Sequence, residues 1–261
     1  MYQIYRIMKI LLSPAKSLNY EEHLPTKKFT TPQFIQQSQE VNSALKNLSV
    51  KDLRDLMAIS EKLATLNFER NQNRAYQLSQ LSENARQAIF AFNGDVYDGI
   101  DAYSLSTKSI NYLQKNLRIL SGLYGVLKPL DLIEPYRLEM GTKLPINDHK
   151  NLYEFWKQTV TNALLAELSA KEVIVNLASN EYFKVIDTKA IPNQIITPDF
   201  KDFKNGKLKT ISFFAKKARG QMTRFMADHN ITKIEDIKLF DIGRYQYDEQ
   251  LSTENKWVFT R

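Results

Sequence analysis

The sequence predicts a mixed α/β fold, in which one compact domain has a largely buried central sheet flanked by helices. Three short apolar runs, near residues 10, 119 and 174, have the length and composition of buried strands. Between and after these runs, apolar residues recur at spacings of three and four, which is the period of one helix face. A chain of 261 residues fits one domain, or two at most.

Composition narrows the chemistry that this chain can perform. Cysteine is absent, which excludes disulfides, a thiol nucleophile and Cys-ligated metal centres, and fits a reducing cytoplasm. The three histidines share no motif, so we expect no metal site and no cofactor. No run approaches the roughly 18 apolar residues that cross a membrane. The formal charge of +7 favours an acidic partner such as nucleic acid.

The N-terminal segment MYQIYRIMKILLS is too short and too polar for a signal peptide. Met8 followed by Lys9 resembles an alternative start of the chain. We therefore predict that residues 1–7 are an N-terminal extension and that residues 8–261 form the domain.

The first predicted strand, around residues 10–12, ends in Ser13-Pro14-Ala15-Lys16. Small residues and a lysine directly after an N-terminal strand are typical of a pocket rim in α/β folds. A plain turn with a solvated lysine is the alternative.

The next segment is predicted to be helical. An apolar stripe over residues 34–48 indicates one helix, and Ser49 with Asp52 resembles a capping box that starts a second. A break near Ser60 would make the second and third helices a helix–hairpin–helix-like element, in which Lys62 and the following amides meet a DNA phosphate. The usual glycine-rich hairpin is missing, so an ordinary helical pair is the alternative.

Residues 85–92 carry another helical stripe, which ends in the turn-rich segment 93–99. Asp95 and Asp98 of this segment lack the spacing of a calcium-binding loop, so we expect them to be solvated turn residues. Apolar residues over 110–117 then lead into the second predicted strand.

Glycine, proline and tyrosine are concentrated between Leu117 and Gly141, in the sequence LRILSGLYGVLKPLDLIEPYRLEMG. The start of this stretch suits a buried strand, and the rest is a poor helix and an unusual core strand. Glycines after a strand let the backbone come close to another group. The tyrosines and charged residues that follow supply stacking surface, charge and hydrogen bonds. A structural loop is the alternative.

A helix over residues 152–168 and a strand over residues 173–175 complete this pattern, and polar residues again follow the strand directly. Sites in open α/β sheets lie beyond the carboxyl ends of the strands, so three parallel neighbouring strands would bring their polar segments into one cleft. The predicted cleft residues are Ser13, Lys16, Ser121, Tyr124, Tyr136, Arg137, Asn176, Ser179, Tyr182 and Lys184, with Glu139 and Glu181 as candidate general acids or bases. Mutual pairing of the charged members is the alternative explanation.

Strands and a tight turn are predicted in the C-terminal third. Residues 195–196 suggest one strand and residues 208–214 another, with Asn205-Gly206 as the hairpin turn. Thr232 and Glu235 resemble a capping box, and residues 256–259 indicate a last strand.

Positive charge gathers between Lys201 and Arg224, where eight basic residues accompany a single acid, Asp202. From about residue 215 this segment is predicted to be a helix with Gly220 in its interior. Because glycine there costs about 1 kcal/mol relative to alanine, we expect another backbone or a phosphate to approach closely. The predicted DNA-binding residues are Lys62, Lys216, Lys217, Arg219 and Arg224, and a solvated basic face is the alternative.

Five long motifs resemble the bacterial YaaA family of peroxide stress proteins: LLSPAKSL (11–18), ARQAIFAFNGDVYDG (85–99), the stretch 117–141, NLASNEYFK (176–184) and ISFFAKKARGQMTRF (211–225). The resemblance runs from Met8 to Arg261. It implies a cytoplasmic protein with a compact mixed α/β fold that helps cells survive hydrogen peroxide and limits unincorporated intracellular iron. It also implies DNA binding through a basic cleft and a helix–hairpin–helix-like element. Since cysteine is absent and histidine scarce, we expect any effect on iron to be indirect.

The leading functional prediction is a monomeric DNA-binding stress protein that does not associate with a membrane. Its expected partner is double-stranded DNA, including distorted or damaged duplex. Basic residues would contact phosphates, and Tyr124, Tyr136 and Tyr182 would stack on an exposed base. One alternative is an enzyme that acts on a nucleobase or nucleoside in the cleft, with a cleft cation holding phosphate. A second is a protein whose cleft binds a small anionic metabolite.

Overall fold

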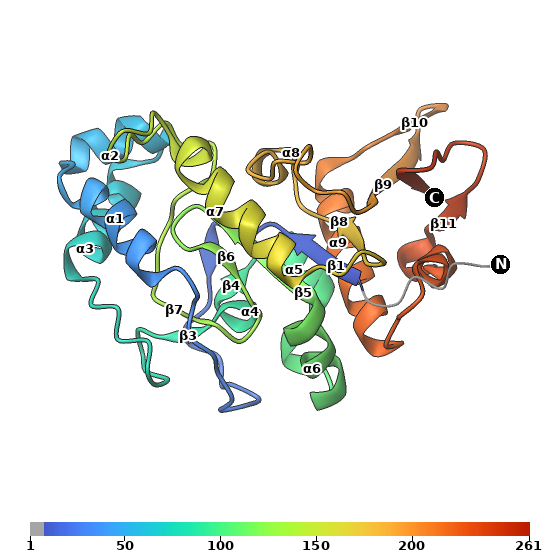
Figure 1. Ribbon diagram of the computed structural model, residues 1–261, viewed down its shortest axis with the longest axis horizontal. Helices are drawn as coiled ribbons and strands as arrows, with labels where there is room; N and C mark the ends of the chain where they lie inside the picture. The colour runs from blue at the N-terminus through green and yellow to red at the C-terminus, as the bar shows by residue number, and fades with distance from the viewer. Residues whose placement is uncertain (1–7) are drawn as a thin grey trace.

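The computed structural model describes residues 8–261, and the predicted extension lies outside the described residues. Its elements are β1 (Met8–Leu12), β2 (Ser17–Leu18), α1 (Ile35–Lys46), α2 (Val50–Met57), α3 (Glu61–Asn73), β3 (Arg86–Gln87), α4 (Ala88–Ala91), β4 (Phe92–Asn93), α5 (Asp95–Ile100), η1 (Ala102–Ser104), α6 (Thr107–Asn116), β5 (Leu117–Ser121), β6 (Gly125–Leu127), β7 (Leu132–Ile133), α7 (Leu152–Glu167), β8 (Val173–Asn176), α8 (Asn180–Phe183), β9 (Ile195–Lys204), β10 (Lys207–Lys209), α9 (Ser212–Asp228), η2 (Ile234–Leu239), η3 (Ile242–Arg244), β11 (Gln246–Asp248) and β12 (Lys256–Thr260). A central sheet of eight strands with helices around it confirms the predicted fold class (Figure 1).

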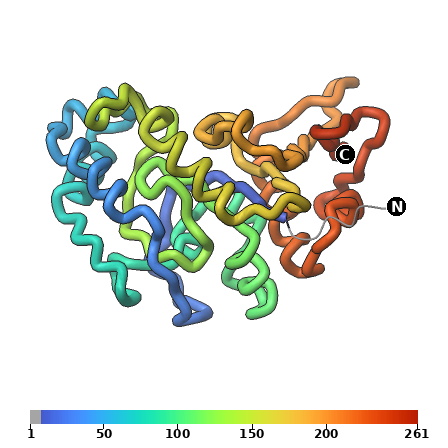
Figure 2. Tube along the Cα trace, in the orientation of Figure 1, coloured from blue at the N-terminus to red at the C-terminus, as the bar shows by residue number. Residues whose placement is uncertain are grey.

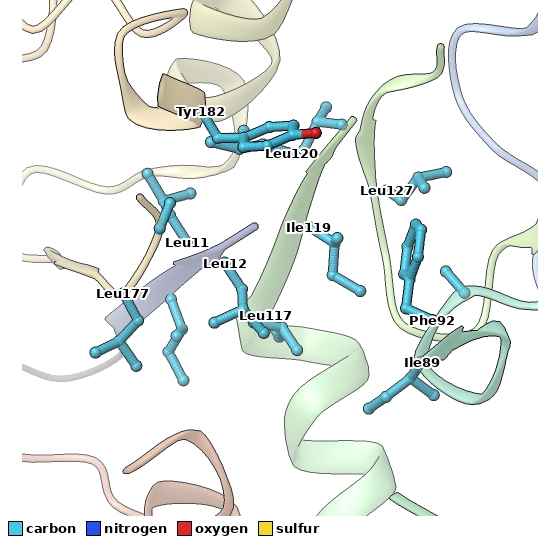
Figure 3. Packing of buried hydrophobic residues seen from close by; sticks show 14 of the residues in the cluster. Leu11, Leu12, Ile89, Phe92, Leu117, Ile119, Leu120, Leu127, Leu177 and Tyr182 are labelled. Carbon is cyan, nitrogen blue, oxygen red and sulfur yellow. The ribbon is translucent and has the colours of Figure 1, made fainter. Parts of the chain in front are cut away.

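Strand β1 lies in the middle of the sheet, with β5 and β8 parallel to it on either side. The order across the sheet is β11-β12-β9-β8-β1-β5-β6, and β10 pairs with β9. Every residue of β1, β5 and β8 is buried, as the apolar runs near residues 10, 119 and 174 predict for strands covered on both faces. Figure 3 shows the leucine and isoleucine side chains of β1 and β5 packed into this core.

The five parallel strands have the order second, first, third, fourth, fifth along the chain, as in other doubly wound sheets. The chain moves from β1 to β5 in one direction and back across to β8 in the other. Right-handed crossovers therefore put α6 and α7 on opposite faces. Helix α7 crosses in front of the sheet in Figure 1, and α9 packs on α5 and α6. In such sheets a crevice opens where the direction reverses, which here lies between β1 and β8.

The two ends of the long axis are built from different parts of the chain. Figure 2 shows helices α1–α3, coloured blue to cyan, at one end, and the orange and red C-terminal elements at the other. None of the helices between residues 8 and 261 is both long and apolar enough to cross a membrane.

Several local predictions are confirmed. Helices α1 and α7 occupy the apolar stripes predicted over residues 34–48 and 152–168, and the Ser49–Asp52 capping box begins α2. A three-residue link from Ala58 to Ser60 joins α2 to α3, so the break near Ser60 is present. Whether this pair is a DNA-binding helix–hairpin–helix stays a prediction.

The predicted helix over residues 85–92 and the predicted turns over 93–99 are both wrong. Residues 86–87 pair with β7 and residues 92–93 with β2, which leaves only one helical turn in between. The following segment forms α5, and Gly99 lets this helix lie directly against α9.

Two predictions after residue 208 are also wrong. Strand β10 ends at Lys209, and Ser212 already begins α9, so the apolar pair Phe213-Phe214 lies on a helix instead of a strand. Thr232 and Glu235 form no capping box, because η2 is a 3₁₀ segment preceded by Lys233.

Candidate functional site

The loops after β1 and β8 meet at the crevice between these strands. The Ser179 amide donates to Ser13 Oγ at 2.9 Å, and the two hydroxyl oxygens lie 3.3 Å apart. Tyr97 of α5 donates to the Ser13 carbonyl at 3.1 Å, which holds the loop from the other face. The structure thus brings together the polar segments that follow the first and the third of the predicted strands.

Ser121, Tyr124 and Tyr136 follow β5 but lie inside the core. The Ser121 hydroxyl is 2.7 Å from the Tyr136 hydroxyl and accepts from the Tyr124 amide at 3.0 Å. The two rings pack edge to face with 5.5 Å between centroids. Ser121 and Tyr124 are 0% exposed and Tyr136 is 5% exposed, so the expectation that these tyrosines stack on a nucleic-acid base is wrong.

Glu139 links the segment after β5 to the loop after β1. Its Oε1 lies 2.9 Å from Lys16 Nζ and 3.2 Å from Arg137 Nη2. The Lys16 side chain is 63% exposed, whereas those of Glu139 and Arg137 are 14% and 19% exposed. The predicted mutual pairing of charges therefore exists for these three residues.

The second oxygen of Glu139 has a different environment. Glu139 Oε2 and Arg137 Nε are buried, and neither has a hydrogen-bond partner among residues 8–261. Buried polar atoms without partners are rare in folded proteins and commonly mark functional positions. A donor without a partner, Arg137 Nε, and an acceptor without a partner, Glu139 Oε2, therefore belong to the same partly buried ion pair.

Glu181 of the short helix α8 and Lys184, the residue that caps its C-terminal end, flank the same region. Glu181 Oε1 accepts from the Gly141 amide at 3.1 Å, and Tyr153 donates to the Glu181 carbonyl at 2.8 Å. The Lys184 ammonium lies over the Tyr153 ring, 5.1 Å from its centroid. Neither Glu181 nor Lys184 forms an ion pair with a residue in the described range 8–261.

Tyr182 of α8 and Asn176, the last residue of β8, are both buried beside the site. Burial raises the pKa of Tyr182 well above its usual value, and nearby Tyr136, Glu181 and Glu139 raise it further. Figure 3 shows Tyr182 at the carboxyl ends of β1 and β5, close to Leu120. The Asn176 side chain accepts from the Ala178 amide at 3.1 Å, which fixes the turn after β8.

Helix α9 packs on α5, and α5 begins beside the loop that follows β1. Lys216 Nζ lies 3.6 Å from Asp95 Oδ2 at the start of α5, next to Ala15 of the β1 loop. Lys217 is exposed. Burial lowers the pKa of Arg219, and nearby Asp199 opposes this shift.

Arg224 is held by the fold. It donates to the carbonyl oxygens of Ile100 and Asp101 and to Ser104 Oγ, and also pairs with Asp228. These contacts engage Nε and Nη1 of the guanidinium. Gly220 permits the approach of a backbone, because a Cβ there would lie 1.8 Å from the Val96 carbonyl oxygen.

Lys62 lies far from the other predicted DNA-binding residues. It is exposed in the first turn of α3, which is capped by Ser60. Helices α3 and α9 occupy opposite parts of the long axis in Figure 1. The predicted DNA-binding residues thus belong to two separate surfaces.

The prediction missed several residues of this region. Tyr97 and Gly141 bond directly to cleft residues, and Asp95 pairs with Lys216, yet none follows an apolar strand in the sequence. A buried ion pair of Arg74 with Glu134, at 3.7 Å, was also missed; it lines a cavity of about 730 Å³ beside α3.

Comparison with known proteins adds a family to this geometry. A family model described as "Peroxide stress protein YaaA" matches residues 8–251. A UPF0246 protein of Flavobacterium johnsoniae is 55% identical over 254 residues, which covers 97% of this chain and 100% of the relative. UPF0246 proteins of Aliivibrio fischeri and Neisseria gonorrhoeae are 52% and 49% identical, each over 256 residues, 97% of this chain and 98% of the relative.

Proposed function

The chain belongs to the YaaA family of peroxide stress proteins, and we propose that it acts in this response by binding DNA, shielding it from oxidative damage, and limiting unincorporated iron. The observation that carries the proposal is the basic surface formed by the β9–β10 hairpin and the first half of α9. Phosphate contacts by lysine and arginine supply most of the affinity of sequence-independent DNA binding.

The positive charge of this surface is largely uncompensated. Lys204, Lys207, Lys209 and Lys217 are exposed, and none forms an ion pair within residues 8–261. Asp202, the single acid between Lys201 and Arg224, is buried and already bonded to Arg261 and Tyr245. A duplex, whether intact, distorted or damaged, carries the complementary charge.

The test is a titration of duplex DNA at several salt concentrations. Wild-type affinity should fall steeply with salt, and the slope of log K against log salt should decrease by about 0.9 for each contacting lysine removed. Lys204→Gln combined with Lys217→Gln should therefore weaken binding to all sequences alike. Lys171→Gln, which alters an exposed lysine just before the amino end of the central strand β8, is the matched control.

Wild-type protein that binds no duplex, or a double variant with unchanged salt slope, contradicts the proposal.

The iron role is tested in cells that lack the gene. Chelator-accessible iron, measured by electron paramagnetic resonance after peroxide treatment, should be higher in these cells and return to normal when the gene is restored.

A second candidate function is an enzyme that acts on a nucleobase or nucleoside. The observation in its favour is Glu139, a partly buried carboxylate with one oxygen paired to two cations and the other unpartnered among the described residues. Such a group suits general acid or base catalysis, with Lys16 and Arg137 beside it to hold an anionic substrate. Turnover of nucleosides or of damaged bases in DNA, measured by mass spectrometry, tests this candidate.

A further inference from the structure

The β9–β10 hairpin carries an apolar pair that the core does not use. Phe203 and Leu208 lie directly opposite each other in the register, and their exposed fractions are 67% and 36%. Directly opposite residues of an antiparallel pair share one face of the ribbon. Single exposed apolar side chains are common, but a paired set at a projecting tip indicates an interaction site.

The opposite face of the same hairpin is basic. Lys204 lies opposite Lys207, and Lys209 lies opposite Asp202. Because Asp202 is bonded to Arg261 and Tyr245, it does not neutralise these lysines. The hairpin is therefore a two-faced ribbon, apolar on one side and cationic on the other.

The hairpin is tightly built and well anchored. Its turn consists of Asn205 and Gly206 with φ of 53° and 73°, as expected for a two-residue hairpin turn that matches strand twist. The first part of β9 lies inside the sheet, between β8 and β12. A Cβ at Gly206 would meet no atom within 4 Å, so the tip stands free.

Further aromatic surface adjoins the base of the hairpin. Phe213 and Phe214 in the first turn of α9 are 53% and 39% exposed. The Arg261 guanidinium stacks on Phe214, with 4.5 Å to the ring centroid. The backbone carbonyl oxygen of Arg261 accepts from the Phe203 amide at 2.8 Å. Phe203 and Phe214 are thus tied to the same residue.

We propose that this hairpin is a wedge that inserts Phe203 beside an unpaired or weakly stacked base of DNA while its lysines contact the flanking phosphates. A two-stranded ribbon fits a DNA groove, and apolar side chains that enter a base step recur in proteins that bind bent or opened duplex. The charge of Lys204, Lys207 and Lys209 makes a polyanion the complementary partner. This inference rests on the proposed DNA-binding function and names the feature of the DNA that the protein recognises.

The experiment compares two synthetic duplexes, one fully paired and one with a short unpaired centre. Phe203→Ala combined with Leu208→Ala should bind the opened duplex about tenfold more weakly than wild type, because stacking on a base is lost. The fully paired duplex should lose less than about twofold, since its phosphate contacts remain. Leu239→Ala, which removes a leucine elsewhere that is 71% exposed, as Phe203 is at 67%, should change neither affinity.

Phe203→Trp gives a direct readout. The native Trp156 and Trp257 are buried, at 0% and 5% exposed, so the introduced indole is the one that DNA can reach. Its fluorescence should be quenched by the opened duplex and much less by the paired one.

The outcomes separate this inference from the function on which it rests. Wild-type protein that binds neither duplex overturns the DNA-binding proposal itself. Wild-type binding that is matched by the double alanine variant, or an unquenched indole at saturation, overturns the wedge alone. Binding of phosphatidylserine vesicles that depends on Phe203, with DNA binding independent of it, would assign the hairpin to a lipid surface and also overturn the wedge.

Discussion

Arg224 Nη1 lies 3.0 Å from the carbonyl oxygen of Asp101, and this bond fastens the middle of α9 to the C-terminal cap of α5. The same guanidinium also bonds to Ile100, Ser104 and Asp228. We expect Arg224→Ala to lower the free energy of unfolding by roughly 1–3 kcal/mol, because several acceptors on α5, η1 and α9 lose a charged donor. Urea denaturation measures this change.

Lys217 provides the contrast on the same helix. Its side chain is exposed and forms no ion pair within the described residues, so Lys217→Ala should change stability by less than about 0.5 kcal/mol. Equal destabilisation by the two variants would show that Arg224 does not fasten the helices.

Gly220→Ala should destabilise the protein more than any exposed substitution on α9. The added Cβ would lie 1.8 Å from the Val96 carbonyl oxygen, which belongs to the backbone and cannot swing aside. Separation of α5 from α9 is the only relief, and overpacking of this kind costs about 1–3 kcal/mol or more. A melting temperature equal to that of wild type would contradict the close contact.

Asp131 predicts a specific dependence of stability on pH. Burial raises its pKa to about 6 from 3.8, although Thr30 Oγ1 and the Lys128 amide both donate to it. The folded state binds this proton more tightly than the unfolded state, so protonated Asp131 stabilises the fold. This stabilisation is full below about pH 4 and is lost as pH rises through about 6. The difference of about two between the folded and unfolded pKa values of Asp131 corresponds to roughly 3 kcal/mol in the free energy of unfolding.

Asp131→Asn removes the titrating group and should remove this part of the pH dependence. Urea denaturation of both proteins at several pH values isolates it, because all other groups cancel in the difference. A wild-type minus variant difference that stays constant with pH would contradict the assignment.

Glu139→Gln tests whether the charged cluster acts or only supports the fold. The amide keeps the shape and one acceptor but removes the charge that Lys16 and Arg137 share. If Glu139 acts on a ligand, cells carrying this variant should survive peroxide no better than cells lacking the gene. The melting temperature should change by less than about 4 °C, which is about 1 kcal/mol for a chain of this size.

Glu181→Gln is the companion variant, because the amide oxygen can still accept from the Gly141 amide. Full peroxide survival with both variants would leave the cluster as scaffolding and assign the activity to the basic surface.

The strand pattern could predict the meeting of Ser13 and Ser179, because buried parallel strands that end together must bring their following residues to one edge. It could not predict the fate of Tyr124, since a polar aromatic residue after a strand points inward or outward according to its turn. Here the turn directs it into the core, where its hydroxyl accepts from the Glu134 amide at 3.2 Å.

The contacts of Arg224 could not be predicted from the sequence for another reason. Its partners Ile100 and Asp101 lie more than 120 residues earlier in the chain, and nothing in the local pattern records them. Short pairings such as residues 86–87 with 132–133 were hidden in the same way, because two residues carry no detectable period.

The contact between Gly99 and Gly220 also has a consequence for synthesis of the chain. Helix α5 leaves the ribosome about 110 residues before α9 begins, which at usual translation rates is on the order of 10 s. Throughout that interval α5 has no partner for its glycine face. The nascent chain must carry this incomplete surface until its C-terminal segment emerges, and chaperones have that interval in which to bind it.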